Sequence, residues 1–373
     1  SSDKNFKSTD ELHRYGIRTR EIGLNWAKAD SRFDLSKEVN EPNKVGYVVE
    51  IDPLNPNSTP KKHTALGRFK HENAELVISK DGKIIVYMGD DERGEYLYKY
   101  VSNESMNEVK DKSTLLSNGN LYVAKFNDNF TGEWLLLDTQ TTGLSSKAEV
   151  CIFTRLAASK VGATTMDRPE WIASNPKKNE VCCCLTNNKN RGIKTNKGGD
   201  KVDVDKVNPR KNNKYGQIVR WKPRDNNHSS VYFEWDLFVV AGNPNVHDDN
   251  NRGSKNIDKE NMFNSPDGLK FDKYGRLWIQ TDGNYSNSGD FKGMGNNQML
   301  IADTNTGKIK RFMVGPKECE VTGLTFAPDY KTVFVGIQHP GERLGSNFPD
   351  NGNNKPRSCI IAIQKKDGSE ILT

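Results

Sequence analysis

Short runs of β-prone residues, each bounded by turn residues, recur along this chain, and the 3.6-residue period of amphipathic helices is nearly absent. Typical runs are residues 45–51, 84–88 and 333–337, which are rich in Val, Ile, Tyr and Phe. Only residues 8–14 and 166–174 favour short helices. The pattern therefore predicts an all-β protein.

A strand–turn–strand unit occurs three times, at residues 74–87, 268–279 and 323–335. A polar segment follows the second strand of each copy: Gly89-Asp90-Asp91, Thr281-Asp282-Gly283 and Gln338-His339-Pro340. Such repeats predict a β-propeller with four-stranded antiparallel blades around a central channel. Equivalent strand ends of successive blades would meet at that channel, so these polar residues are expected to converge there and bind metal.

The 373 residues are expected to form a single propeller domain. Two polar stretches, near residues 187–214 and 244–262, are predicted to be solvated loop insertions. The chain opens Ser1-Ser2-Asp3 without Met or a hydrophobic leader. We therefore expect a fragment that lacks N-terminal blade strands, and hence an incomplete propeller.

Charge and composition exclude several classes of protein. The formal net charge is +6, but the lysines are scattered among acids, which argues against nucleic-acid binding. A mild positive field would favour approach of an anionic substrate. No run reaches the roughly 18 apolar residues of a transmembrane helix. The six cysteines lack paired C-x-x-C motifs, so a structural zinc site is not expected, and Cys182-Cys183-Cys184 is interpreted as a strand of buried free thiols.

Carboxylates gather beside the predicted turns, where several strand ends could supply the oxygen ligands of a hard cation such as Ca²⁺. Each Asp-Gly pair taken alone is equally typical of an ordinary turn. In Asp167-Arg168-Pro169-Glu170, a guanidinium between two acids could hold a phosphate while the acids hold metal; the alternative is a surface ion pair. His339 is the best site candidate among the histidines, the alternative being a hydrogen-bonded structural residue. Phosphate-loop, G-x-S-x-G and H-E-x-x-H motifs are absent from the sequence.

Ordered motifs along nearly the whole chain resemble the PhoX family of alkaline phosphatases. They include Gly67-Arg68-Phe69-Lys70-His71-Glu72, Gly89-Asp90-Asp91-Glu92-Arg93-Gly94-Glu95-Tyr96, Met166-Asp167-Arg168-Pro169-Glu170-Trp171, Ser265-Pro266-Asp267-Gly268-Leu269, Glu320-Val321-Thr322-Gly323 and Gln338-His339-Pro340-Gly341-Glu342. The resemblance implies a β-propeller that hydrolyses phosphate monoesters at alkaline pH. It also implies Fe³⁺ and Ca²⁺ as cofactors, and a periplasmic or extracellular location after twin-arginine export.

The resemblance also implies roles for particular residues. Metal ligands would be Glu72, Asp90, Asp91, Glu170, Asp267 and Glu320, and substrate or catalytic contacts would come from Arg168 and His339. One departure is clear: the family's Cys-Glu-Glu segment, whose cysteine binds iron, has no counterpart in this sequence. This fragment alone is therefore expected to bind iron poorly.

The implied mechanism is metal-ion catalysis, in which the cations neutralise phosphoryl oxygens and activate a nucleophilic oxygen while Arg168 stabilises developing charge. Two other classes stay open: a non-catalytic propeller that binds a partner, and a calcium-dependent propeller hydrolase acting on esters or lactones. Iron with calcium would favour the phosphatase, calcium alone the ester hydrolase, and neither metal the binding module. The sequence leaves the preferred phosphoester and the oligomeric state open.

Overall fold

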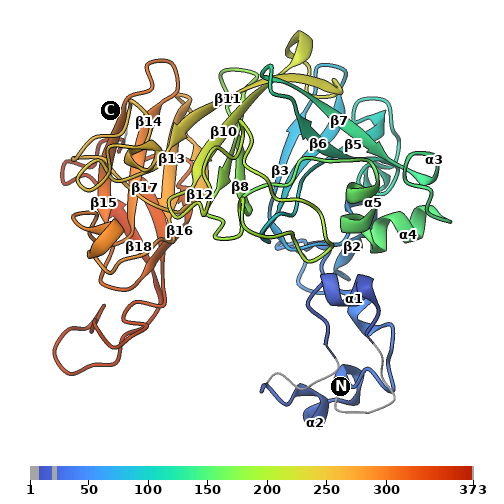
Figure 1. Ribbon diagram of the computed structural model, residues 1–373, viewed down its shortest axis with the longest axis horizontal. Coiled ribbons are helices and arrows are strands. Elements are labelled where there is room, and N and C mark those ends of the chain that lie inside the picture. Colours follow the sequence, from blue (N-terminus) through green and yellow to red (C-terminus); the bar gives the residue numbers. More distant parts are fainter. Residues whose placement is uncertain (1–7, 19–22, 372–373) are drawn as a thin grey trace.

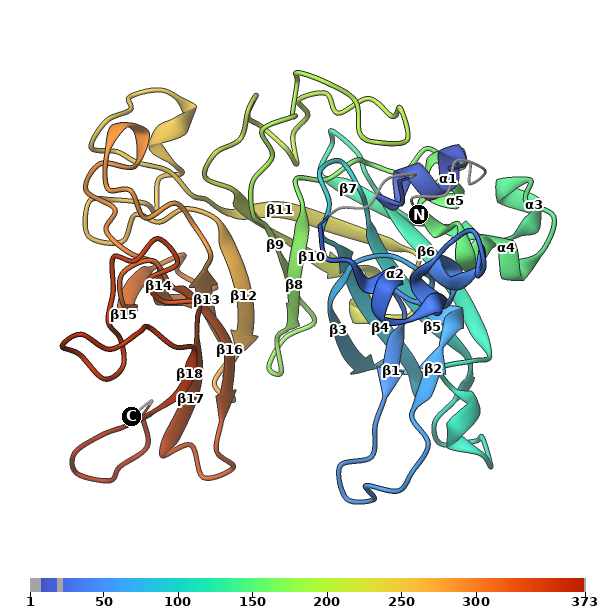
Figure 2. The ribbon, with the colours of Figure 1, turned by 90° about the horizontal axis from the view of Figure 1, so that it is seen from below.

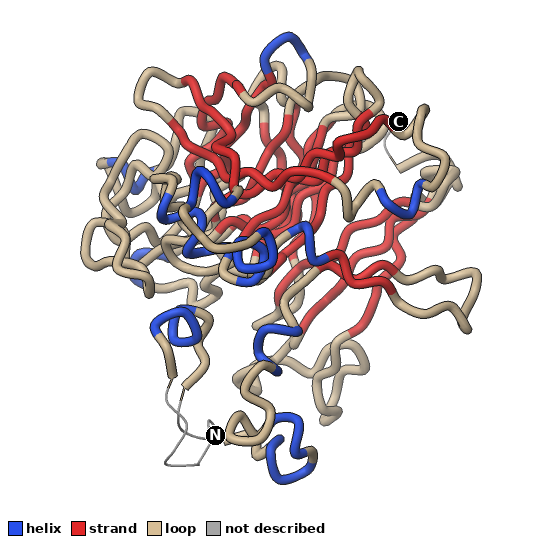
Figure 3. The backbone as a smooth tube through the Cα atoms, turned by 90° about the vertical axis from the view of Figure 1, so that its right-hand side faces the viewer, coloured by secondary structure: helices blue, strands red, loops and turns tan. Residues whose placement is uncertain are grey.

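The computed structural model describes residues 8–18 and 23–371. Strands are the main regular secondary structure, and the helices are short segments in the connections (Figure 3). The helix predicted at residues 8–14 is confirmed as α1 (Asp10–Arg14), and the Thr9 hydroxyl caps it by accepting the Leu12 N–H at 3.3 Å. The other helices are α2 (Trp26–Ala29), α3 (Thr139–Thr142), α4 (Lys147–Ile152), α5 (Thr154–Lys160) and the 3₁₀ helices η1 (Ser31–Phe33), η2 (Glu41–Lys44), η3 (Thr64–Leu66), η4 (Lys112–Thr114), η5 (Arg224–Asn226), η6 (Asn250–Arg252) and η7 (Gly289–Phe291).

Within the described residues the strands form four antiparallel sheets. The smallest is the hairpin of β1 (Val48–Glu50) and β2 (Lys61–His63). The largest has nine strands: β3 (His71–Ile78), β4 (Lys83–Asp90), β5 (Leu97–Ser105), β6 (Gly119–Phe126), β7 (Thr131–Leu137), β8 (Pro169–Ser174), β9 (Val181–Leu185), β10 (Gln217–Pro223) and β11 (Tyr232–Val240). A four-stranded sheet contains β12 (Pro266–Phe271), β13 (Arg276–Thr281), β14 (Gln298–Asp303) and β15 (Ile309–Val314), and a three-stranded sheet contains β16 (Glu320–Phe326), β17 (Thr332–Gln338) and β18 (Cys359–Gln364).

The nine-stranded sheet consists of two meanders joined at their outer strands. The first meander runs from β3 to β7 and the second from β8 to β11, and β7 pairs with β11 through residues such as Gly132 and Phe233. The edge strands β3 and β8 also pack against each other, so the sheet is nearly closed. Figure 1 shows the sheets in an arc, from β3–β7 through β8–β11 to β12–β18.

The first strands of the four meanders, β3, β8, β12 and β16, lie next to one another (Figure 2). Side-chain hydrogen bonds hold the β3–β8 pair together. The Asn73 amide donates to the Ile172 carbonyl at 2.8 Å and accepts its N–H at 3.0 Å, and Glu75 accepts the Ser174 N–H at 2.8 Å. The three predicted strand–turn–strand repeats are confirmed as the β3–β4, β12–β13 and β16–β17 hairpins.

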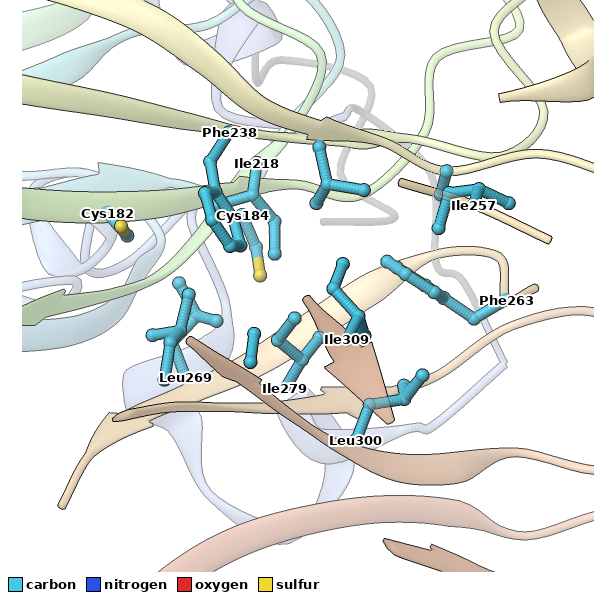
Figure 4. Packing of buried hydrophobic residues seen from close by; sticks show 14 of the residues in the cluster. Cys182, Cys184, Ile218, Phe238, Ile257, Phe263, Leu269, Ile279, Leu300 and Ile309 are labelled. Carbon is cyan, nitrogen blue, oxygen red and sulfur yellow. The ribbon is translucent and has the colours of Figure 1, made fainter. Parts of the chain in front are cut away.

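Apolar clusters between adjacent meanders hold the arc together. One cluster fills the space between β9–β11 and β12–β15, where Ile218 and Phe238 meet Leu269 and Ile279 (Figure 4). The cysteine run is confirmed as buried strand β9, whose thiols are free. Cys182 and Cys184 enter this cluster, whereas Cys183 points into the cluster on the other side, as the two-residue period of a strand requires.

The structure differs from the sequence predictions at three points. Residues 169–174 form strand β8 instead of a helix, because pairing with β9 buries Glu170, Ile172 and Ala173. The sheets do not divide into four-stranded blades throughout the described residues, because β7–β11 pairing merges two meanders. The two polar loops are not simple solvated excursions: Arg191 and Asn208 are buried in the first, and Ile257 and Met262 enter the core from the second.

Candidate metal centre

The predicted site residues gather where the first strand of each hairpin begins and its second strand ends. In an antiparallel hairpin these two positions are neighbours: His71 pairs with Asp90, Pro266 with Thr281, and Glu320 with Gln338. Glu72 is the second residue of β3, and Asp91 directly follows β4. One edge of the arc therefore collects carboxylates from distant parts of the sequence.

The strands β3, β8 and β12 each carry a β-bulge at a carboxylate residue. The register shifts between His71 and Ala74, between Pro169 and Ile172, and between Pro266 and Leu269. The enclosed acids are Glu72, Glu170 and Asp267. A bulge changes the direction of a side chain relative to regular pleating, and bulges are frequent next to functional sites.

Backbone strain accompanies two of the bulges. Arg168 (φ 57°) precedes Pro169, and Ser265 (φ 50°) precedes Pro266. A left-handed conformation is uncommon for residues other than glycine and is costly unless the surrounding structure holds it. Both strained residues stand two positions before a site carboxylate.

Glu72, Asp91 and Glu170 form the first group that could hold a metal ion. Each offers an oxygen, and these atoms lie within 4.8 Å of one another. Close contact between β4 and β8 makes this possible, since a Cβ on Gly89 would stand 2.7 Å from the Glu170 carbonyl oxygen. Glu170 is buried, whereas Glu72 stays exposed.

Asp282, Glu320 and His339 form the second group, with ligand atoms also within 4.8 Å of one another. Gln338 donates to Glu320 Oε2 at 2.6 Å, and His339 Nε2 lies 3.6 Å from the same oxygen. His339 Nδ1 is buried and has no hydrogen-bond partner among the described residues. This group joins the ends of β13 and β17 to the start of β16.

Asp267 lies within electrostatic reach of both groups. Burial, together with Glu320, Glu72, Asp282 and Asp91, raises the pKa of Asp267 well above its ordinary value. Burial, followed by the charges of Asp267 and Asp91, raises the pKa of Glu170 well above its ordinary value, and burial with Asp282 raises the pKa of Glu320 to about 7. A nearby cation would stabilise the ionised form of these clustered carboxylates, and their oxygens are ligands that Ca²⁺-like ions prefer. The donor set therefore fits hard metal ions.

Arg168 lies beside the first group. Its Nε and Nη2 donate to the two Asp91 oxygens at 2.7 and 2.9 Å, and Nη2 also donates to Glu170 Oε1 at 2.9 Å. Over the described part of the chain, no hydrogen bond involves its Nη1. The side chain is 22% exposed, so the guanidinium is held in one orientation and still reaches the open side of the site.

Asp90, predicted as a ligand, belongs to neither group. Its carboxylate instead accepts bidentate hydrogen bonds from Arg155 Nε at 2.7 Å and Nη2 at 2.6 Å. Both side chains are at most 1% exposed. Asp90 therefore connects the end of β4 to α5. The candidate ligand Asp91 is the next residue in the sequence.

We expect Asp90→Ala to lower the free energy of unfolding by about 3–5 kcal/mol, because the buried Arg155 guanidinium loses its bidentate partner and keeps only the more distant Glu95 carboxylate, at 3.8 Å. Urea denaturation measures this change. The matched control is Lys125→Ala at the exposed pair with Glu133, which should cost less than about 1 kcal/mol. Equal effects for the two variants would contradict a structural role for Asp90.

Sequence reasoning did not select Asp282 as a ligand, because Asp-Gly is also a common turn. Its position after β13, equivalent to Asp91 after β4, was the available signal. Asp167, in contrast, has a structural role. Its buried carboxylate accepts hydrogen bonds from Arg191 Nε at 2.7 Å and from the Asn213 amide at 2.9 Å. Neither metal-capable group of the described residues contains a cysteine.

Known proteins resemble this chain in both sequence and fold. The family description "Alkaline phosphatase PhoX" matches residues 1–341. The structure of Pseudomonas fluorescens PhoX in complex with vanadate, a transition state analogue, is 53% identical, with a TM-score of 0.94. The alignment covers 100% of this chain and 66% of that one, so this chain spans just under two thirds of its relative's length.

Other matches are much weaker. A luciferin-regenerating enzyme is 10% identical (TM-score 0.32; 83% of this chain and 81% of that one), and a gluconolactonase from Xanthomonas campestris is 12% identical (TM-score 0.31; 78% and 62%). They are too distant to support an inference. A search of curated proteins found no match. None of the described helices is long and apolar enough to cross a membrane.

Proposed function

Because this chain belongs to the PhoX family of alkaline phosphatases, we propose that it hydrolyses small phosphate monoesters at a metal centre built from the two groups described above. The observation that carries the proposal is the convergence of Glu72, Asp91 and Glu170 with Arg168 at one edge of the sheets. The vanadate complex of the 53% identical relative supports phosphoryl chemistry. We further propose that the arc of meanders is part of a β-propeller whose channel holds this centre.

In this proposal, Glu72, Asp91 and Glu170 hold one cation, Asp282, Glu320 and His339 hold another, and Asp267 lies between them. Ca²⁺ suits these oxygens, and Fe³⁺ follows from the family resemblance. Bound cations would supply Lewis acidity for the phosphoryl group. His339 would then be a metal ligand instead of a substrate or catalytic contact, which revises its predicted role.

The protein's own contribution to the reaction would be orientation and charge. Asp91 and Glu170 fix the Arg168 fork, and its Nη1 is left to donate to a phosphoryl oxygen. A preorganised donor stabilises charge that grows on that oxygen without reorganising during the reaction. No side-chain nucleophile is required. A periplasmic or extracellular location is part of the same proposal.

The test is hydrolysis of p-nitrophenyl phosphate at high pH, which a calcium chelator should abolish and added Ca²⁺ should restore. Elemental analysis of the same preparation gives the metals. Activity that survives chelation and metal-free purification would overturn the metal mechanism. Calcium without iron, with activity on esters or lactones but not phosphates, would favour the alternative hydrolase.

A further inference from the structure

A cavity of about 560 Å³ opens beside Arg168 and Asp91, within the usual range of small-molecule sites, about 300–1,000 Å³. Its inner wall is the edge of the first carboxylate group. Its outer wall comes from the loop between β9 and β10, through Lys189, Lys194 and Lys197. The loop that sequence reasoning interpreted as solvated thus forms one side of the candidate active site.

Six cationic side chains and two carboxylates line this cavity. Two of the cations share one carboxylate: Lys70 and Lys197 approach Glu92 Oε2 at 3.1 and 2.7 Å. Despite partial burial, these ammonium groups lower the pKa of Glu92 to about 2. Glu92 therefore stays charged and anchors Lys70 and Lys197 at the rim.

Three further cations in the cavity have no carboxylate partner among the described residues. Lys189 and Lys194 are exposed and form no ion pair there, and Arg93 Nε is buried without a hydrogen-bond partner. A buried donor without a partner costs free energy unless a ligand or water satisfies it. The uncompensated charge lines the same cavity as Arg168, the proposed phosphate contact.

Buried contacts hold the loop that carries Lys189, Lys194 and Lys197 in place. The buried Arg191–Asp167 pair, at 2.7 Å, ties the loop to the start of the β8 segment. The Asn196 amide donates to the Gly94 carbonyl at 2.9 Å, which holds the loop against the turn after β4. Charges held by buried anchors lose less entropy on binding than charges on a mobile loop.

We propose that this cavity binds a second phosphate group of the substrate, so that the enzyme favours small bisphosphorylated esters over monophosphates with neutral leaving groups. The inference rests on the proposed function. The scissile phosphate would contact Arg168, and the second phosphate would meet Lys189, Lys194 and Arg93. Lysine recognises phosphate as a point charge, so the subsite would tolerate varied carbon skeletons.

The experiment compares fructose 1,6-bisphosphate with fructose 6-phosphate on the metal-loaded protein. We expect kcat/KM to be about tenfold higher for the bisphosphate, since each exposed charge pair contributes a factor of a few. The double variant Lys189→Gln/Lys194→Gln should lose most of this advantage and keep its rate on the monophosphate. Sodium chloride at about 0.5 M should shrink the advantage in the parent protein, because salt screens exposed charges.

Lys201→Gln is the matched control, as an exposed lysine of the same loop outside the cavity. It should retain the bisphosphate preference. Equal kcat/KM for the two sugars, or an unchanged preference in the double variant, overturns the subsite.

If neither sugar is hydrolysed, the proposed function fails while calorimetric binding of fructose 1,6-bisphosphate still decides the subsite. Tighter binding by the parent than by the double variant supports it, and equal binding overturns it.

Discussion

Arg168→Ala should lower kcat for p-nitrophenyl phosphate by about two orders of magnitude or more, the scale of losing one preorganised donor to a charged transition state. The metals should stay bound, because a guanidinium does not ligate cations. Its removal also frees the carboxylates of Asp91 and Glu170 from a competing positive charge. The measurement combines initial rates with metal content by mass spectrometry.

Arg168→Lys separates charge from geometry. It should restore only part of the rate, because an ammonium lacks the planar fork that Asp91 and Glu170 hold in place. Near-full activity of Arg168→Ala would mean that Arg168 is only an ion-pair partner of the two carboxylates. Loss of metal from that variant would instead indicate that Arg168 supports the ligand positions.

Glu170→Gln should lose metal and bring hydrolysis to background. The substitution keeps the size of the side chain and removes the carboxylate that Glu170 would offer to a cation beside Glu72 and Asp91. Carboxylate ligands supply both the oxygen and the charge that hold a hard cation. The expected readout is a loss of at least about one metal equivalent per chain, with far-UV circular dichroism unchanged.

Glu180→Gln is the control for that result. Glu180 is equally buried, but it accepts from Asn175 at 2.7 Å and Thr304 at 2.6 Å and lies outside both metal-capable groups. It should keep its metals. A Glu170→Gln protein with the metal content of the parent would remove Glu170 from the ligand set.

The hairpins could be predicted because local sequence determines them. The β-prone runs and the turn residues between them specify β3–β4, β12–β13 and β16–β17, and antiparallel pairing then places the start of one strand beside the end of the next. The roles of Glu72, Asp91, Asp267 and Glu320 as metal ligands were implied by the family resemblance, and they stay predictions.

What could not be predicted depends on contacts between distant residues. Asp90 and Asp91 are adjacent in sequence, and only the burial of Arg155 behind β4 decides that Asp90 forms an ion pair. The β8 segment was predicted as a helix because its pairing with β9 is invisible to local propensity. The position of the β9–β10 loop beside the site was not predicted, because Arg191 and Asp167, whose ion pair anchors this loop, are 24 residues apart.

The spread of site residues along the chain has a consequence for the order of folding. The two groups draw on positions from Glu72 to His339, and each hairpin can form locally before any of them meet. Contacts between residues so far apart carry a large loop-closure cost and form late. During refolding, strand content should therefore recover earlier than any capacity to bind cations, and until then the acidic edges of β3, β8, β12 and β16 would be separate. Because those edges repel one another, bound cations would assist the last docking step. The concentration of free cations would therefore set the rate of this step.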